Sequence, residues 1–185
     1  MKTLFAWDLH GVLEKGNVHA VQNICNTVLK EFGKSRRISI EEVIELYGSS
    51  WYQYYRKLCP EAPESEIREM IEWDHRMGKI FTKKFMKPMD HVLDVLKEIK
   101  ETGNSNVVIT NTRPENISRY LEDIGIIRFL DGFIGVPKEK ENENFCIIEH
   151  KGKVLKDYAK KHGFSKVVMI GDKETDVKAG KIAGA

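Results

Sequence analysis

Three short apolar runs in the chain each end at a polar or acidic residue. They are Leu4–Trp7 before Asp8, Val107–Ile109 before Thr110, and Val167–Ile170 before Gly171 and Asp172. Runs without polar alternation are typical of strands covered on both faces, and the helical patterns between them favour right-handed crossovers in a parallel sheet. Because parallel strands end at one edge of a sheet, Asp8, Thr110 and Asp172 are expected to lie together where open α/β sheets bind ligands.

Apolar residues at helical spacing occupy most of the rest of the chain. In the first half, helices are predicted at about Val18–Phe32, after a capping box at Ser39 and Glu42 as far as Gly48, at Trp51–Leu58, and from Pro63 to Gly78 with a continuation towards Met86. In the second half, helices are predicted after Pro88, from Pro114 to Gly125, at Lys151–His162 and at Glu174–Ala183, with a short strand near Phe129–Gly135. Polar turns are expected at 13–17, and a solvated loop at Lys138–Asn144.

Roughly 70 residues of helical pattern separate the first strand from the second, far more than the ~12 residues that a crossover needs. We therefore expect an α/β fold whose Rossmann-like parallel-sheet core is formed by residues 1–16 and 86–185. Residues 17–85 are expected to form an inserted all-helical cap. A length of 185 residues suits one domain with such an insertion.

Composition excludes several classes of function. A formal net charge of +2 and a pI near 8.3 give no global field that would favour nucleic acid or a membrane surface. The three cysteines, Cys25, Cys59 and Cys146, are far apart and odd in number, so buried, reduced thiols are expected rather than a disulfide framework. No leader pattern precedes Leu4, and no apolar stretch approaches the 18 or so residues of a membrane span, which favours a cytoplasmic protein.

Four motifs in order resemble those of the haloacid dehalogenase (HAD) superfamily, whose members are mostly magnesium-dependent phosphatases. The motifs are Asp8-Leu9-His10-Gly11-Val12-Leu13, Thr110 after its strand, Lys151 before a helix with Lys153 as the alternative, and Gly171-Asp172-Lys173-Glu174-Thr175-Asp176. The helical insertion lies where this family carries its C1-type cap. The resemblance therefore implies a hydrolase of small phosphorylated substrates, as a monomer or a homodimer.

The resemblance also implies a role for each motif residue. Asp8 would be the nucleophile that forms an aspartyl-phosphate. Mg²⁺ would be bound by Asp8, Asp172 and the backbone carbonyl of His10, with Asp176 acting through water or by orienting a ligand. Phosphoryl oxygens would be bound by Thr110 and Asn111, and Lys151 would screen their charge.

His10 departs from the family pattern, because phosphatases of this family usually carry Asp at this position to protonate the leaving oxygen and later to activate water. An imidazole, with an ordinary pKa of ~6.5, can move a proton near neutrality. The alternatives are a catalytically impaired protein that binds phosphate or a partner, and a carbon–phosphorus hydrolase that uses a cap lysine. Simpler interpretations also stay open: Thr110 as a loop cap, either lysine as a solvated charge, and Asp176 as a helix-terminus carboxylate.

The predicted strand at Val167–Ile170 is the last one in the sequence. Relatives of the resembled family usually continue with a further strand beyond this point. Either the chain is trimmed, or this strand is an exposed edge, which would invite pairing with a second copy.

Overall fold

The computed structural model describes residues 2–47, 49–137 and 145–185. The chain forms two compact units, one made of Met1–Lys15, Lys87–Lys138 and Phe145–Ala185 and the other of Gly16–Met86. The loop expected at Lys138–Asn144 and the helix end expected at Gly48 lie outside the described residues.

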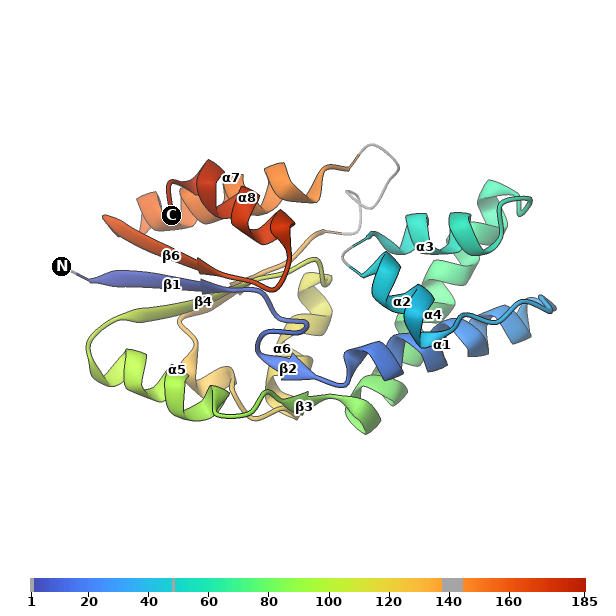
Figure 1. Cartoon of the computed structure of the whole chain (residues 1–185), viewed down its shortest axis with the longest axis horizontal. Coiled ribbons are helices and arrows are strands. Elements are labelled where there is room, and N and C mark those ends of the chain that lie inside the picture. The colour runs from blue at the N-terminus through green and yellow to red at the C-terminus, as the bar shows by residue number, and fades with distance from the viewer. Residues whose placement is uncertain (1, 48, 138–144) are drawn as a thin grey trace. The chain divides into compact units, whose positions relative to one another are not determined.

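The first unit is built on a four-stranded sheet in the order β5-β4-β1-β6, with every pair parallel (Figure 1). Its strands are β1 (Thr3–Trp7), β4 (Ser105–Ile109), β5 (Gly132–Ile134) and β6 (Lys166–Ile170). Ala6 of β1 lies opposite both Val107 of β4 and Met169 of β6. The predicted parallel sheet is therefore confirmed.

Burial differs between the central and the outer strands. All five side chains of β4 are buried, as its apolar run predicted. Those of β6 are half-buried or exposed, so the prediction of a strand covered on both faces is wrong for β6, whereas the alternative of an edge strand is confirmed. The reason is its place in the sheet, because β6 pairs with β1 on one side only.

Helices lie on both sides of this sheet (Figure 1). On one side are α7 (Ile147–Lys161) and α8 (Glu174–Ala183), and on the other are α5 (Val92–Glu101) and α6 (Pro114–Asp123), which is followed by a 3₁₀ turn η1 (Ile127–Phe129). Leu4, Ala6 and Val107 pack against Leu155 and Ala159 of α7. Since the sheet has helices on both sides, the expected α/β fold is confirmed.

Two local predictions are wrong in ways that bear on the site. Helix α7 begins at Ile147, so Lys151 lies in its second turn and not at its start. The polar turn expected at 13–17 contains a strand, β2 (Glu14–Lys15), which pairs antiparallel with β3 (Lys87–Pro88). The side chain of Glu14 is buried there.

A buried asparagine, Asn106, connects the sheet to neighbouring segments of the first unit. The Asn106 side chain accepts a hydrogen bond from the Trp7 indole N–H at 3.0 Å and donates to the carbonyls of Leu96 at 3.0 Å and Phe129 at 3.2 Å. Its backbone N–H donates to Asp131 at 2.9 Å. These bonds connect β1 and β4 to α5, to η1 and to the residue that precedes β5.

The second unit is all helical. It consists of α1 (Asn17–Glu31), α2 (Ile40–Leu46), α3 (Trp51–Leu58) and α4 (Glu64–Phe85). The predicted capping box at Ser39 and Glu42 is present, and Ser50 and Gln53 form a second one. None of the helices described is both long and apolar enough to span a bilayer.

The cysteines are free but not alike. Cys25 and Cys59 are buried in the helical unit, and burial raises the pKa of the Cys25 thiol well above its ordinary value. Cys146 is exposed just before α7, so the expectation of a buried thiol is wrong there.

Asn106→Ala should lower the free energy of unfolding by about 2–4 kcal/mol, because it leaves the Trp7 N–H and two carbonyls without their partner. Lys97→Ala on α5 is the matched control. It removes only an exposed ion pair of 3.7 Å with Glu101 and should change stability by less than about 0.5 kcal/mol. Urea unfolding measures both variants, and equal effects would contradict the assigned role of Asn106.

Candidate active site

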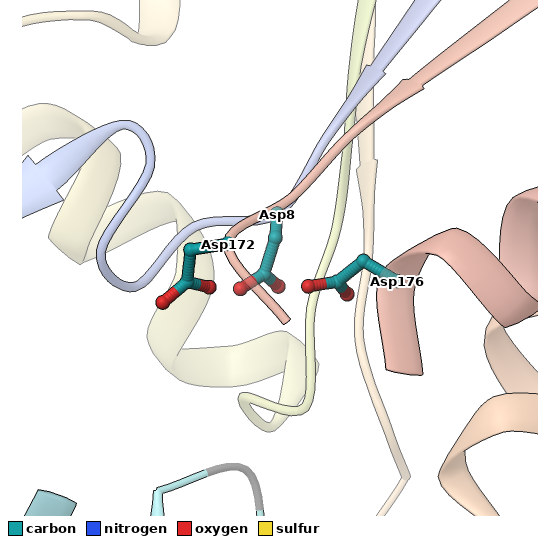
Figure 2. A group of neighbouring side chains, drawn as sticks. All are labelled: Asp8, Asp172 and Asp176. Carbon is teal, nitrogen blue, oxygen red and sulfur yellow. The ribbon is translucent and has the colours of Figure 1, made fainter. Parts of the chain in front are cut away.

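The ends of β1 and β6 bring three carboxylates together (Figure 2). Asp8 follows β1, and its N–H donates to the carbonyl of Ile170 at 2.9 Å. Asp172 follows β6, and Asp176 lies in the first turn of α8. One ligand oxygen from each of the three carboxylates lies within 4.8 Å of the others.

A buried ammonium group joins two of these carboxylates. Lys151 Nζ lies 2.7 Å from Asp8 Oδ1 and 2.8 Å from Asp176 Oδ1. Lys153, the alternative in the sequence, is exposed. Lys151 is therefore the lysine of the cluster. It lies on the buried face of α7, whereas Lys153 lies on the exposed face.

Burial controls the electrostatics of the cluster. It raises the pKa of Asp8 above its ordinary value; Lys151 opposes this effect and Asp176 adds to it. Burial by itself would lower the pKa of Lys151, but the attraction of Asp8 and Asp176 outweighs it and the net shift is upward. Lys151 therefore stays protonated, and one ammonium group stands among three carboxylates.

Two glycines make room for the carboxylates. Gly11 has a φ of +83°, and a Cβ built on it would lie 2.9 Å from Asp172 Oδ2. A Cβ on Gly171 would collide with the side chain of Asp176. The backbone thus passes so close to Asp172 and Asp176 that a side chain at either glycine would collide with a carboxylate.

The second strand end supplies hydroxyl groups. Thr110 is buried, and its N–H donates to the carbonyl of Ile134 at 3.0 Å. Its hydroxyl donates to Thr112 Oγ1 at 3.3 Å, and the N–H of Thr112 donates back to Thr110 Oγ1 at 3.3 Å. Asn111 between them is half-buried.

The side chain of His10, in the first motif, contacts one residue of β2 and one that follows β4. Its Nδ1 is 2.9 Å from Glu14 Oε1, and its Nε2 is 2.9 Å from Thr112 Oγ1. Neither partner is predicted from the sequence, because Glu14 falls in the expected polar turn and Thr112 follows the strand end by two residues. The available signal was a glutamate, Glu14, four residues after His10 and directly after the first motif.

The donor set suits a hard divalent cation. Carboxylate oxygens are the ligands that Mg²⁺ prefers. Three carboxylates against one ammonium leave two formal negative charges, which a divalent ion would balance. The absence of a side chain at Gly11 leaves the Asp172 carboxylate in this position, because an added Cβ would collide with it.

Lys151→Met should destabilise the fold by about 3–5 kcal/mol in metal-free buffer, because Asp8 and Asp176 would be left buried without their cation. Lys153→Met is the matched control on the same helix and should cost less than about 0.5 kcal/mol. Both are measured by urea unfolding in the presence of a chelator. A Lys151 variant as stable as the Lys153 variant would contradict the buried ion pairs of Lys151.

Comparison with known proteins shows the family of the chain. The model of the haloacid dehalogenase-like hydrolases matches residues 6–185. The protein named "Putative pyrophosphatase PpaX" of Caldanaerobacter subterraneus subsp. tengcongensis is 23% identical over 183 residues, which cover 98% of this chain and 78% of that protein.

Solved structures share the fold. A "predicted phosphoglycolate phosphatase" from Haemophilus somnus gives a TM-score of 0.84 at 18% identity, over 98% of this chain and 81% of that one. A haloacid dehalogenase-like family hydrolase from Streptococcus pneumoniae gives 0.79 at 17% identity, over 99% and 81%. With the family model matching nearly the whole chain, the protein belongs to the haloacid dehalogenase-like hydrolases.

Proposed function

We propose that the protein is a Mg²⁺-dependent phosphatase that acts on a small phosphorylated metabolite through an aspartyl-phosphate at Asp8. The observation that carries this proposal is the convergence of Asp8, Asp172, Asp176 and Lys151 at the ends of β1 and β6. Relatives named for pyrophosphate and phosphoglycolate hydrolysis support phosphoryl transfer to water as the reaction class.

Asp8, Asp172 and the backbone carbonyl of His10 would hold the cation. Asp176 would act indirectly, because its two oxygens already accept from Lys151 Nζ at 2.8 Å and from the N–H of Lys173 at 3.3 Å. The bound ion would offset the repulsion between the Asp8 carboxylate and an approaching phosphoryl group.

The reaction would proceed in two displacements. An oxygen of Asp8 attacks phosphorus, the bond from phosphorus to the leaving oxygen breaks, and the phosphoryl group stays on Asp8 as a mixed anhydride. Water then attacks phosphorus, releases phosphate and restores the carboxylate. Lys151 keeps Asp8 oriented throughout and offsets charge on the transferring group, while Thr110 and Asn111 bind phosphoryl oxygens.

The leaving oxygen must gain a proton in the first step. We assign this transfer to His10, which occupies the position of the usual aspartate and lies beside the Thr110 strand end through Thr112. The same substitution is the observation that favours the rival function, in which the protein binds phosphate or a partner without turnover.

We propose that the helical unit acts as a C1-type cap. Three aromatic residues of α3 contribute mainly to the core of this unit, since Tyr54 and Tyr55 are buried and Trp51 packs beside them. The residues that select the substrate are therefore to be sought outside this aromatic set.

The native protein should hydrolyse p-nitrophenyl phosphate with Mg²⁺ and lose this activity with a chelator. Asp8→Asn should lower kcat by roughly three orders of magnitude or more, because the amide is a poor nucleophile. Asp157→Asn, an exposed carboxylate on α7, is the control. Pyrophosphate and phosphoglycolate extend the panel. A native protein inert on every substrate would contradict the proposal and favour the binding function.

Gly11→Ala should raise the Mg²⁺ concentration for half-maximal activity by about tenfold or more, because its Cβ would displace Asp172. Gly103→Ala is the matched control: its φ is +79°, but nothing lies within 4 Å of the added Cβ. Both variants carry backbone strain of about 1 kcal/mol. Equal Mg²⁺ dependence in the two would argue against a metal-binding role for Asp172.

A further inference from the structure

Glu14 is a buried carboxylate that the proposed reaction does not yet use. Its side chain is 1% exposed. Burying a carboxylate costs several kcal/mol unless hydrogen bonds compensate it. One bond that does so comes from the ring of His10, at 2.9 Å from Glu14 Oε1.

The backbone holds Glu14 in place from two directions. Its N–H donates to the carbonyl of Leu9 at 3.2 Å, and its carbonyl accepts from the N–H of Gly11 at 3.2 Å. Glu14 also pairs with Pro88 in the β2–β3 ribbon. The carboxylate is thus fixed relative to the turn that carries His10.

The partners of His10 define the direction of its hydrogen bonds. An ionised carboxylate only accepts, so Nδ1 carries the proton that is shared with Glu14. In a neutral ring Nε2 is then the acceptor, and the hydroxyl of Thr112 donates to it at 2.9 Å. The hydroxyl of Thr110 donates in turn to Thr112 at 3.3 Å.

A chain of hydrogen bonds therefore runs from Thr110 through Thr112 and His10 to Glu14. It joins the second motif to the first and leaves the His10 ring little freedom to rotate. The ring of Tyr120 lies beside it, with centroids 6.2 Å apart.

We propose that Glu14 is a positioning residue for His10, which fixes the Nδ1-protonated tautomer and directs Nε2 towards the Thr112 side of the site. The proposal rests on the proposed function: the doubly protonated ring gives the proton of Nε2 to the leaving oxygen, and the neutral ring that remains keeps its proton on Nδ1, shared with Glu14. Orientation by a carboxylate explains how an imidazole replaces the usual aspartate, because a ring that could rotate would lose the geometry that proton transfer needs.

The tautomer can be measured without any activity. Long-range ¹H–¹⁵N spectra of the ¹⁵N-labelled full chain, recorded as the pH is raised until the His10 ring is neutral, should show that the remaining proton is on Nδ1. The signal is assigned by its loss in His10→Gln. Glu14→Met, of equal length but without an acceptor, should lose the Nδ1 preference. Glu14→Gln, whose carbonyl can still accept, should keep it.

Glu149→Met is the matched control, since this exposed glutamate precedes a different histidine, His150. It should leave the His10 signals unchanged. An Nε2-protonated His10 in the native protein would overturn the proposal, whether or not Glu14→Met folds. A tautomer unaffected in folded Glu14→Met would also overturn it.

Kinetics separate positioning from a merely structural role. Glu14→Met should lower kcat on an alkyl phosphate by about tenfold with little change in KM, and in a His10→Gln background it should lower kcat by less than about twofold. Equal losses in the two backgrounds would mean that Glu14 does not act through His10. If the native protein hydrolyses no phosphate, the proposed function fails, and the spectra still decide the role of Glu14.

Discussion

The site depends on one interaction, the contact of the Lys151 ammonium with Asp8 and Asp176 at 2.7 and 2.8 Å. Parallel strands that end at a common edge bring carboxylates together, and like charges in a buried place repel. A single cation on α7 makes that convergence tolerable. It also ties α7 to the end of β1 and to the first turn of α8, so the fold and the site share the same bonds.

The remaining charge gives the site its chemistry. One ammonium leaves the carboxylate cluster with excess negative charge, and the raised pKa of Asp8 reflects its burial and its neighbour Asp176. A divalent cation would relieve both effects. Glycine at position 11 leaves room for the Asp172 carboxylate, which would be one of the ligands of that cation. In the proposed function, stability without metal and reactivity with metal would therefore depend on the same few groups.

Much of this arrangement could be predicted from the sequence, because the signals are local. Apolar runs that end in Asp8 and Asp172, and the capping box at Ser39, report their own structure without reference to distant residues. The parallel order of the sheet then brings the strand ends together. What failed depended on tertiary contacts: the apolar run of β6 does not show that the strand is half-buried, although an edge position was an alternative, and Cys146 is exposed although cysteine is usually buried.

Two charged residues are the most informative: Lys151, which the sequence favoured but placed before its helix, and Glu14, which it placed in a turn. A lysine inside a helix carries no mark that tells it from its neighbours, and only the direction of α7 separates Lys151 from exposed Lys153. Glu14 resembled a turn residue because glutamate is rarely buried, yet a partner four residues away makes it so. Both residues can be buried because each has a charged or hydrogen-bonding partner. Neither composition nor periodicity reveals these partners.

The central claim is that the carboxylates beside Lys151 form a divalent-cation site, and its most direct test is a count of bound ions. Titration of the native protein with Mn²⁺, followed by its electron paramagnetic resonance signal, should show one ion bound per chain, displaced by Mg²⁺. The Asp172→Asn protein should bind at least about tenfold more weakly. A native protein that binds no ion, or an Asp172→Asn protein that binds as tightly as the native one, would contradict the account.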